Sequence, residues 1–168
     1  MAKLVKGPFS IQWGSNPILD VSELGFNYDV ATNDYETIQG TTYTVEGAIT
    51  ASVEVTLLAS DVASLATIFP QYYVPKGSTL STGEQVTGQD GAIDIKAAAC
   101  DSSSSNYDLE ITSCNGEVTR LVNARTSLSG VDFADNSLRT VTVTFRGEPE
   151  NGQGILQFFG ENAISRES

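Results

Sequence analysis

Residues 47–75 read GAITASVEVTLLASDVASLATIFPQYYVP and change from one periodicity to another within a few positions. From Val45 to Leu57 the odd positions are apolar or glycine, while the even positions are mostly polar. This alternation is typical of a β-strand with one buried face and is too regular for a helix. At ~3.3 Å per residue such a strand spans roughly 40 Å, about twice the common length. The sequence therefore predicts one unusually long strand here.

A short helix is expected directly after this strand, at about residues 60–69. Ser60 is a favourable N-cap residue, and Asp61 places a negative charge at the positive end of the helix dipole. Pro70 prevents the helix from continuing. The apolar positions recur at helical spacing and form a single stripe: Val62, Leu65, Ala66 and Phe69. A helix this short is marginal alone, so it must pack on a sheet.

The remainder of the chain also favours β structure. Alternating runs bounded by turn residues predict strands at residues 9–14, 24–29, 34–39, 107–112, 117–129, 138–146 and 155–159. The tripeptide 31–33 (Ala-Thr-Asn) is expected to be the turn between the second and third of these strands. Residues 71–105 form a long excursion with one expected strand at 92–97, and residues 1–8 are expected to be mobile.

These elements add up to a mainly β fold over residues 1–168, expected to form a single domain. Two antiparallel sheets are expected to form a β-sandwich or barrel, with one short flanking α-helix on one side.

The charge of the chain narrows the classes of partner. Nine Lys and Arg residues stand against 21 Asp and Glu residues, which gives a net charge of −12. A protein that grips nucleic acid by neutralising phosphates needs the opposite balance. The excess of acid has two readings, which are simple solubility or a surface that repels another polyanion.

Residues that carry chemistry are scarce. The chain has no histidine, and it lacks the GxSxG, P-loop and GxGxxG motifs. Residues 90–94 (DGAID) lack the acid spacing of an EF-hand and are expected to be a turn. Asp108 and Glu110 share a strand face about 7 Å apart, which fits a solvated face as well as a carboxylate pair. We therefore expect no enzyme activity, no cofactor and no metal site.

Two further features concern the compartment. Residues 1–14 contain no apolar core of a signal peptide, and no run approaches the ~20 apolar residues of a membrane span. We therefore expect a protein made in the cytoplasm of its producing cell, without a membrane partner. Cys100 and Cys114 are accordingly expected to be free thiols.

Two segments carry a resemblance to a known family. The strand that runs into a short helix, ITASVEVTLLASDVASLATIF, and the late hairpin, SLRTVTVTFRGEPENGQGILQFF, are similar to bacteriophage tail tube proteins. The resemblance covers roughly residues 40–75 and 105–160, and the same fold is shared by type VI secretion tubes. It implies a β-sandwich or barrel, a ring of six subunits whose long strands join edge to edge into an inner barrel, and rings that stack into a tube.

The resemblance also implies a role. It is that of a structural virion protein of the phage tail, assembled in the host cytoplasm, whose acidic lumen conducts double-stranded DNA during ejection without binding it specifically. Its partners would be copies of itself and other tail proteins, namely the terminator, tape measure, baseplate or sheath. Residues 1–8 and 71–105 would contact neighbouring rings. The lumen-facing candidates, chosen from strand alternation, are Glu46, Thr50, Glu54, Asp108 and Glu110.

Other readings stay open at this point. Each lumen candidate can equally be a solvated residue of the outer surface. The chain can also be another phage component, such as a terminator, a baseplate hub or a capsid-decorating protein. A different class is a carbohydrate-binding sandwich or weak glycosidase that uses Asp108 and Glu110, with Trp13, Tyr72 and Tyr73 lining a sugar site. The missing signal peptide argues against a secreted lectin.

Overall fold

The computed structural model describes residues 4–95, 106–134 and 136–161. Ten strands, one α-helix and one 3₁₀ turn follow one another along these residues. In chain order they are β1 (Ser10–Trp13), β2 (Asn16–Ile18), β3 (Val21–Glu36), β4 (Thr42–Leu57), α1 (Val62–Ile68), η1 (Pro70–Tyr72), β5 (Tyr73–Val74), β6 (Ala92–Ile93), β7 (Asn106–Thr112), β8 (Val118–Ala134), β9 (Leu138–Gly147) and β10 (Leu156–Phe159). The expected mainly β fold with one short helix is confirmed.

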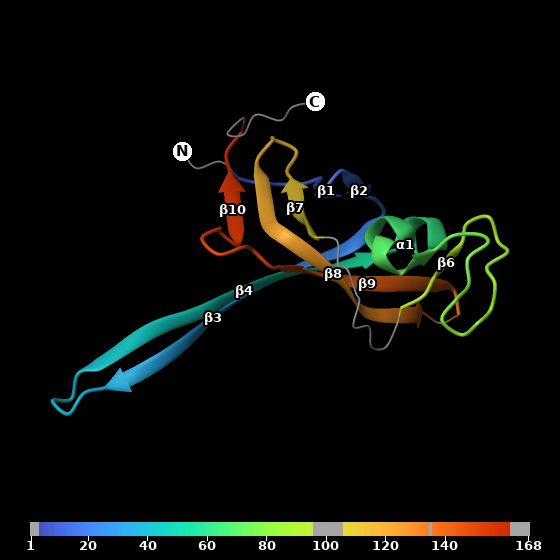
Figure 1. Cartoon of the computed structure of the whole chain (residues 1–168). Helices are drawn as coiled ribbons and strands as arrows, with labels where there is room; N and C mark the ends of the chain where they lie inside the picture. The colour runs from blue at the N-terminus through green and yellow to red at the C-terminus, as the bar shows by residue number, and fades with distance from the viewer. Residues whose placement is uncertain (1–3, 96–105, 135, 162–168) are drawn as a thin grey trace.

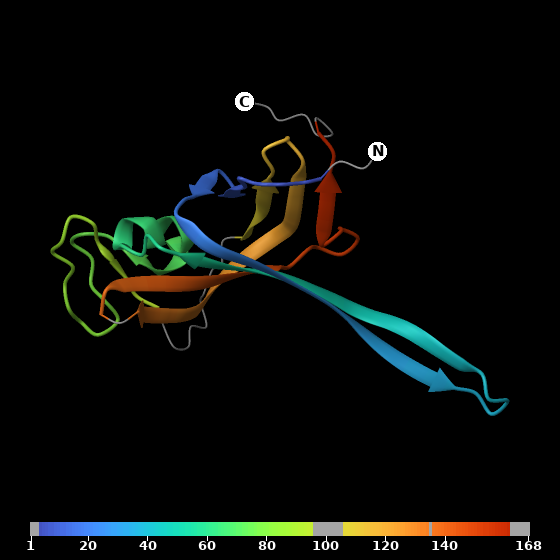
Figure 2. The same cartoon turned by 180° about the vertical axis from the view of Figure 1, so that it is seen from behind.

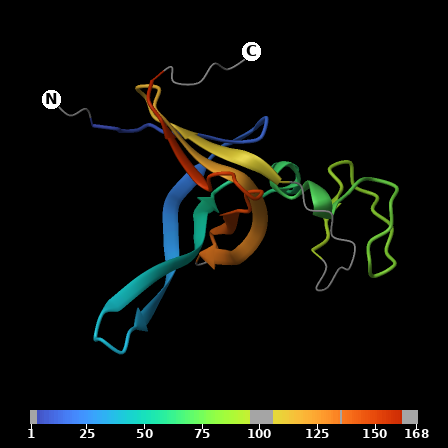
Figure 3. The ribbon, with the colours of Figure 1, turned by 60° about the vertical axis from the view of Figure 1, so that its left-hand side comes forward.

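The strands form two antiparallel sheets of very different size. The large sheet has eight strands in the order β2-β1-β7-β8-β9-β4-β3, with β10 also paired to β8, and the small sheet is the β5–β6 pair. The long strand β8 belongs to two layers, because its first part pairs with β7 and β10 and its second part pairs with β9. The large sheet therefore bends at β8 and packs on itself as an open sandwich (Figures 1 and 3). It is not closed into a barrel, since β2 and β3 end the row without pairing to each other.

The core lies between the two layers. Trp13 on β1 is fully buried and meets the ring of Phe145 on β9 edge-on, with ring centroids 6.0 Å apart. The buried positions of β4 are those predicted from its alternation: Ala51, Val53, Val55 and Leu57. The end of α1 closes this core with Ile68 and Phe69. The inward face of the long strand was therefore predicted correctly.

The start of α1 differs from the sequence prediction. The helix begins at Val62, and Asp61 occupies the N-cap position, where its carboxylate accepts a hydrogen bond from the Ser64 hydroxyl over 2.6 Å. Ser60 does not cap the helix, because its hydroxyl donates to the carbonyl oxygen of Arg139 on β9 over 2.8 Å. In return the Arg139 guanidinium donates to the hydroxyl and the carbonyl oxygen of Ser60. A tertiary contact thus replaces the expected local one.

The expected turn at residues 31–33 is wrong. β3 is one strand of 16 residues, and its register shift against β4 lies between Val30 and Thr32. A β-bulge takes up the extra residue, so the two strands continue to pair to Glu36 and Thr42. The true turn is at residues 37–41, where Gly40 has a φ of 85°.

The excursion contains little regular structure in its described part. Its only strands there are the short β5 and β6, joined by a loop with one bridge between Thr79 and Gln85. The expected strand at 92–97 shrinks to Ala92–Ile93, and residues 96–105, including Cys100, lie outside the described residues. Cys114 is exposed and carries a free thiol. None of the described helices has the length and apolarity needed to cross a membrane.

Candidate functional site: a two-faced hairpin and two open strand edges

The β3–β4 hairpin projects far from the rest of the molecule (Figures 1 and 2). β9 pairs only with Ser52–Leu57 of β4, so residues 42–51 have β3 as their sole strand neighbour among the described residues. A tight turn fixes the tip, where the Thr37 nitrogen donates to the Thr41 carbonyl and the Thr41 nitrogen donates to the Thr37 hydroxyl. The hairpin is therefore a long, ordered projection whose outer half packs on nothing within the described chain.

One face of the hairpin is apolar and exposed. Residues directly opposite in an antiparallel pair share a face, so the residues paired with Val53 and Val55 continue the core side outward. The exposed members of this face, between 39% and 52% accessible, are Leu24, Phe26, Tyr28 and Ile49. A bulge in β4 between Ile49 and Glu46 exchanges the faces of that strand, so the exposed Tyr35, Tyr43 and Val45 lie on the other side of the outer half. An apolar patch of this extent marks a surface that another molecule covers.

The opposite face of the hairpin is acidic. Its carboxylates between the body and the β4 bulge are Glu23, Asp29 and Glu54, whereas Asp34, Glu36 and Glu46 lie beyond the bulge on the other side. No Lys or Arg occurs anywhere between residues 7 and 75. Asp34 accepts a hydrogen bond from the Thr44 hydroxyl over 2.7 Å, which is a neutral partner. The negative charge of the hairpin is thus left without a cation of its own.

The same polar face continues across β9 and β8, but its chemistry changes there. Thr142 and Thr144 on β9 lie opposite Gly130 and Ser127 on β8, so hydroxyl groups dominate. The adjacent row contains Ser52, Arg146 and Arg125. The face is therefore acidic on the hairpin and hydroxyl-rich on the body, with one pair of arginines where the two parts meet.

Two long strand edges are open in the part of the chain that the structure describes. β3 pairs only with β4, so its outer edge is free over Val21–Glu36. The pairing of β7 with β8 ends at Arg125, so residues 126–134 of β8 pair with β9 on one side only. These edges are the two margins of the four-stranded segment β8-β9-β4-β3. Open edges of this length normally invite pairing with another strand.

The predicted site residues separate into two groups. Thr50 and Glu54 lie on the polar face of β4, opposite Asp29 and Gly25 of β3, whereas Glu46 lies beyond the bulge opposite Thr32, on the other face. Asp108 and Glu110 instead lie on β7 in the other layer, whose inward residue Leu109 is buried in the core. The structure therefore does not bring the five residues onto one surface.

Arg120 of β8 stands between the two carboxylates of β7. Its guanidinium lies 3.9 Å from the Asp108 carboxylate and 3.5 Å from that of Glu110. Asp108 also accepts a hydrogen bond from the backbone nitrogen of Asn123 over 2.9 Å. Both carboxylates are therefore engaged with an arginine of the next strand.

The proposed sugar-binding aromatics do not form a platform. Trp13 is fully buried, and Tyr72 packs against Phe69 with ring centroids 6.1 Å apart. Tyr73 is partly exposed but belongs to the small β5–β6 sheet, away from β1. These three aromatic residues therefore do not form the common surface that a carbohydrate-binding function would need.

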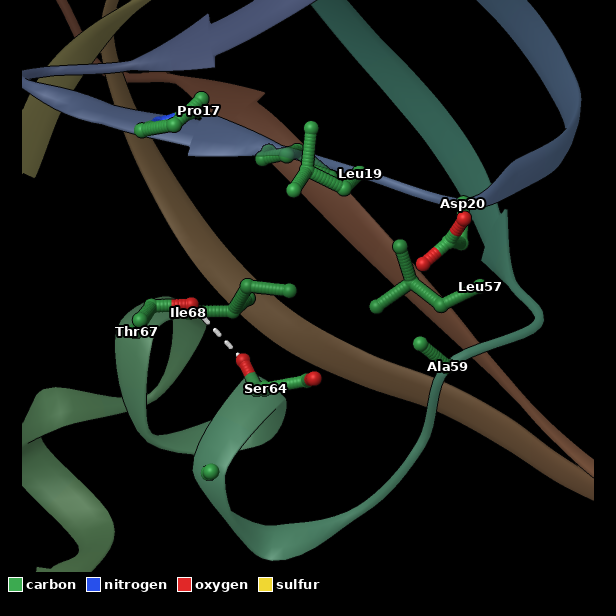
Figure 4. Close-up of a pocket in the computed structure, with 10 residues that line it drawn as sticks. Pro17, Leu19, Asp20, Leu57, Ala59, Ser64, Thr67 and Ile68 are labelled. Atoms are coloured by element: carbon green, nitrogen blue, oxygen red, sulfur yellow. Dashed lines mark hydrogen bonds between the residues drawn. The ribbon is translucent and has the colours of Figure 1, made fainter.

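A small apolar cavity of about 270 Å³ lies between α1 and the chain that joins β2 to β3 (Figure 4). Its walls are largely aliphatic, with Ile18, Leu57 and Ile68 on different sides. Asp20 is the single carboxylate among its lining residues, and the hydroxyl groups there are those of Ser64 and Thr67. Among the described residues, no group of acids and cysteines is arranged to hold a metal ion.

Two arginines on the polar face were missed by reasoning from sequence. Arg146 stood among the polar positions of its predicted strand, and Arg125 lay in a run without clear alternation. The acidic composition directed attention to carboxylates instead. Only the register between β8 and β9 shows that the two arginines are direct neighbours.

Comparison with known proteins gives a fold but no sequence family. No protein-family profile matches the chain, and no curated protein matches it. Among solved structures, the anti-feeding prophage cap, described as a tube terminating cap, superposes with a TM-score of 0.53 and 9% identity over 94% of this chain and 93% of that one. The sheath-tube complex of the extracellular contractile injection system PVC, in its extended state, gives a TM-score of 0.52 and 11% identity over 93% and 88%. The chain therefore has a tail-tube-type fold, which confirms the resemblance at the level of architecture.

Proposed function

We propose that this chain is a structural, non-catalytic subunit of a phage tail tube or a related injection tube. Six copies form a ring, and rings stack into a tube. The polar face of the segment β8-β9-β4-β3 lines the bore, and double-stranded DNA passes along it during ejection. The subunit belongs to the particle, assembles in the host cytoplasm, and meets the tape measure, terminator, baseplate or sheath there.

The observation that carries this proposal is the match between the two open edges. The segment has four strands of alternating direction, so β3 of the next copy in a cyclic ring must run antiparallel to β8. The open edges of β3 and β8 can therefore pair antiparallel between copies. Once the ring closes, neither edge is left unpaired. A head-to-tail contact of this kind also leaves the termini and loops free for other rings.

Side chains along the two edges support the same junction. On β8, Leu128, Val131 and Phe133 lie on the core side and are 39%, 45% and 65% exposed. The core side of β3 carries its own row of exposed apolar residues, which begins at Leu24 and Phe26. Joining the edges places these two rows side by side. Burial at ~25 cal/mol per Å² of apolar surface then favours association.

The chemistry of the polar face suits the passage of DNA. Thr50 and Glu54 line the bore in this proposal, whereas Glu46 lies on the other face of the hairpin and Asp108 and Glu110 lie on the outer face of the other layer. Six copies carry 6 × −12 = −72 formal charges. Duplex DNA carries about one negative charge per 1.7 Å, so such a wall offers few sites where phosphates stick. Screening within ~8 Å keeps the repulsion short-ranged.

A tube terminator is the second candidate, because one of the similar solved structures is described as a tube terminating cap. The two functions differ in assembly. A tube subunit polymerises ring upon ring, whereas a terminator stops after one ring. Residues 4–8 and the described part of the excursion are the proposed contacts between rings.

Electron microscopy of the purified chain tests the proposal. Rings of six that stack into tubes of variable length are expected for the tube subunit, and single rings for the terminator. A strictly monomeric protein at high concentration, in all solution conditions that keep it folded, contradicts both.

Chemical cross-linking tests the junction itself. Asn27→Cys on β3 and Ser129→Cys on β8, in a background with Cys100→Ser and Cys114→Ser, are joined by a short bismaleimide. A ladder of bands up to six copies is expected. Each single-cysteine variant should stop at the dimer, and Asn27→Cys combined with Phe158→Cys on β10 is the control pair. Equal ladders from both pairs would contradict the edge junction.

A further inference from the structure

Arg125 and Arg146 occupy directly opposite positions on β8 and β9. Ser52 of β4 is the next residue in the same row, so both guanidinium groups lie on the polar face. Like charges placed directly opposite on neighbouring strands destabilise a sheet. The two arginines therefore need carboxylates close by to offset their mutual repulsion.

The described residues of one copy supply only part of that charge. Arg125 lies 3.9 Å from the carboxylate of Glu148, which also accepts a hydrogen bond from the Asn106 amide. Arg146 forms no ion pair with any residue that the structure describes. Its closest acid by register is Glu54, one diagonal step away across β4 and β9. One direct carboxylate contact thus serves two arginines.

The β3–β4 hairpin has the opposite imbalance, which is negative charge without nearby cations. It carries carboxylates on the same polar face and has no lysine or arginine among its own residues. Asp29 on β3 lies opposite Thr50, so it does not face a cation across the strand pair. An excess of acid on one margin and two adjacent arginines with one carboxylate contact near the other are complementary between two copies.

The edge junction brings these groups together. When β3 of one copy lies antiparallel to β8 of the next, Leu24, Phe26 and Tyr28 align with Phe133, Val131 and Leu128. The polar faces then align as well, and Asp29 falls opposite Ser127, one step from Arg125 on the same face. A shift of two residues one way places Asp29 opposite Arg125. In both alignments Asp29 lies on the same face as Arg125.

We propose that Arg125, beside Arg146, binds Asp29 of the neighbouring copy's hairpin and thereby sets the register of the junction. This inference rests on the proposed ring and adds to it the ion pairs that select one alignment. A second copy of this chain is the favoured occupant over a phosphate of passing DNA, because the uncompensated acids lie on the margin that meets β8.

A mixing experiment with two charge-reversed chains tests the proposal. The first chain carries Arg125→Glu and Arg146→Glu, and the second carries Asp29→Arg. Each chain alone should assemble at least tenfold less than the wild type in low salt, because acid faces acid or arginine faces arginine at every junction. An equimolar mixture should recover ring formation, since an alternating ring of six has a matched pair at every junction.

Controls separate this inference from the proposed function. Circular dichroism and urea unfolding of each monomer establish that the variants fold, and a folding defect is not repaired by mixing. Conservative variants with Arg125→Lys and Arg146→Lys keep the charge and should retain most of the assembly. The loss in the reversed chains should shrink as NaCl is raised from 50 mM to 500 mM, since screening weakens both the repulsion and the pairing.

The outcomes are distinct. If the wild-type chain forms rings and cross-links while the arginine-reversed chain does so equally well, the ion pairs are wrong and the ring stands. Failure of the folded chains to recover on mixing also overturns the pairing. Rings that form normally but lose retention of a double-stranded DNA fragment would assign the arginines to DNA instead. If the wild type makes no rings at all, the proposed function itself fails.

Discussion

The indole nitrogen of Trp13 donates a hydrogen bond to the carbonyl oxygen of Ala124 over 3.0 Å. Both residues are fully buried, although 111 positions separate them in the chain. Ala124 pairs with both β7 and β9, as its neighbour Arg125 does, so the bond fastens β1 to the bend that creates the two layers. The layer that carries the open edges is therefore positioned by a buried polar contact as well as by packing.

Trp13→Phe should destabilise the monomer by about 2–4 kcal/mol. The Ala124 carbonyl loses its buried donor, which costs ~1–3 kcal/mol, and the smaller ring leaves a cavity that adds to this. Urea unfolding followed by circular dichroism measures the loss. Phe158→Leu, at a site 75% exposed, is the control and should stay within about 0.5 kcal/mol of the wild type. A loss at Trp13 no larger than that of the control would contradict the assigned role.

The reciprocal hydrogen bonds between Ser60 and Arg139 give a second prediction. Ser60→Ala removes the hydroxyl that donates to the Arg139 carbonyl and accepts from its guanidinium, and should cost about 1–2 kcal/mol. Arg139→Lys should not be tolerated as a conservative change, because lysine lacks the planar fork that reaches two oxygens at once. Ser64→Ala, which removes an exposed bond to Asp61 at the helix start, is the matched comparison and should cost less.

Thermal and urea unfolding of the Ser60 and Ser64 variants also decide between two accounts of the helix start. A larger loss at Ser64 than at Ser60 would mean that local capping dominates over the contact with β9.

Gly147, at the end of β9, allows close packing rather than a special backbone angle. A Cβ atom there would lie 2.9 Å from the Ile155 side chain and 3.0 Å from that of Leu121. Gly147→Ala should therefore cost about 1–3 kcal/mol through overpacking. Adding Ile155→Val to the same chain should recover part of the loss. Gly25→Ala is the control, since nothing lies within 4 Å of its added methyl group, and it should be neutral in the monomer.

The alternation of β4 was sufficient to predict which face is buried, because period two leaves only two choices of face. The same alternation could not show that the core side of the hairpin stays exposed. Ile49 lies on the same face as Val53 and Val55 and looks similar in sequence, yet it is 40% exposed while the two valines are buried. Alternation also could not show that a bulge moves Val45 to the other face. Whether an apolar strand face is covered by its own chain or by a neighbour depends on the topology.

Other expectations failed for reasons that also lie beyond local sequence. Residues 31–33 have turn composition, but they remain in β3. A bulge in the strand pair lets the pairing with β4 continue past them. Ser60 has cap chemistry, but Arg139 from a distant strand takes its hydroxyl. Asp108 and Glu110 were correctly predicted to alternate with buried residues, but alternation does not say to which layer a strand belongs. The arginine pair required the register between two strands.

Shortening the hairpin gives the last prediction. Residues 31–48 are replaced by Asn-Gly, which joins the directly opposite residues Val30 and Ile49 through a two-residue type I′ turn. None of the removed residues is buried, so the core between the layers stays intact. The monomer should keep its circular dichroism spectrum and a free energy of unfolding within about 1 kcal/mol of the wild type.

Assembly of the shortened chain should behave differently from its stability. The variant loses residues 31–36 of the 16-residue β3 edge and the exposed Tyr35, Tyr43 and Val45, so rings should fall at least tenfold in sedimentation velocity and electron micrographs. Ile38→Ser, which changes one wholly exposed side chain at the tip, is the matched control and should still form rings. A shortened chain that assembles like the wild type would show that the hairpin is dispensable for the ring. A shortened chain that fails to fold would show that the hairpin stabilises the monomer, against the exposure of every residue removed.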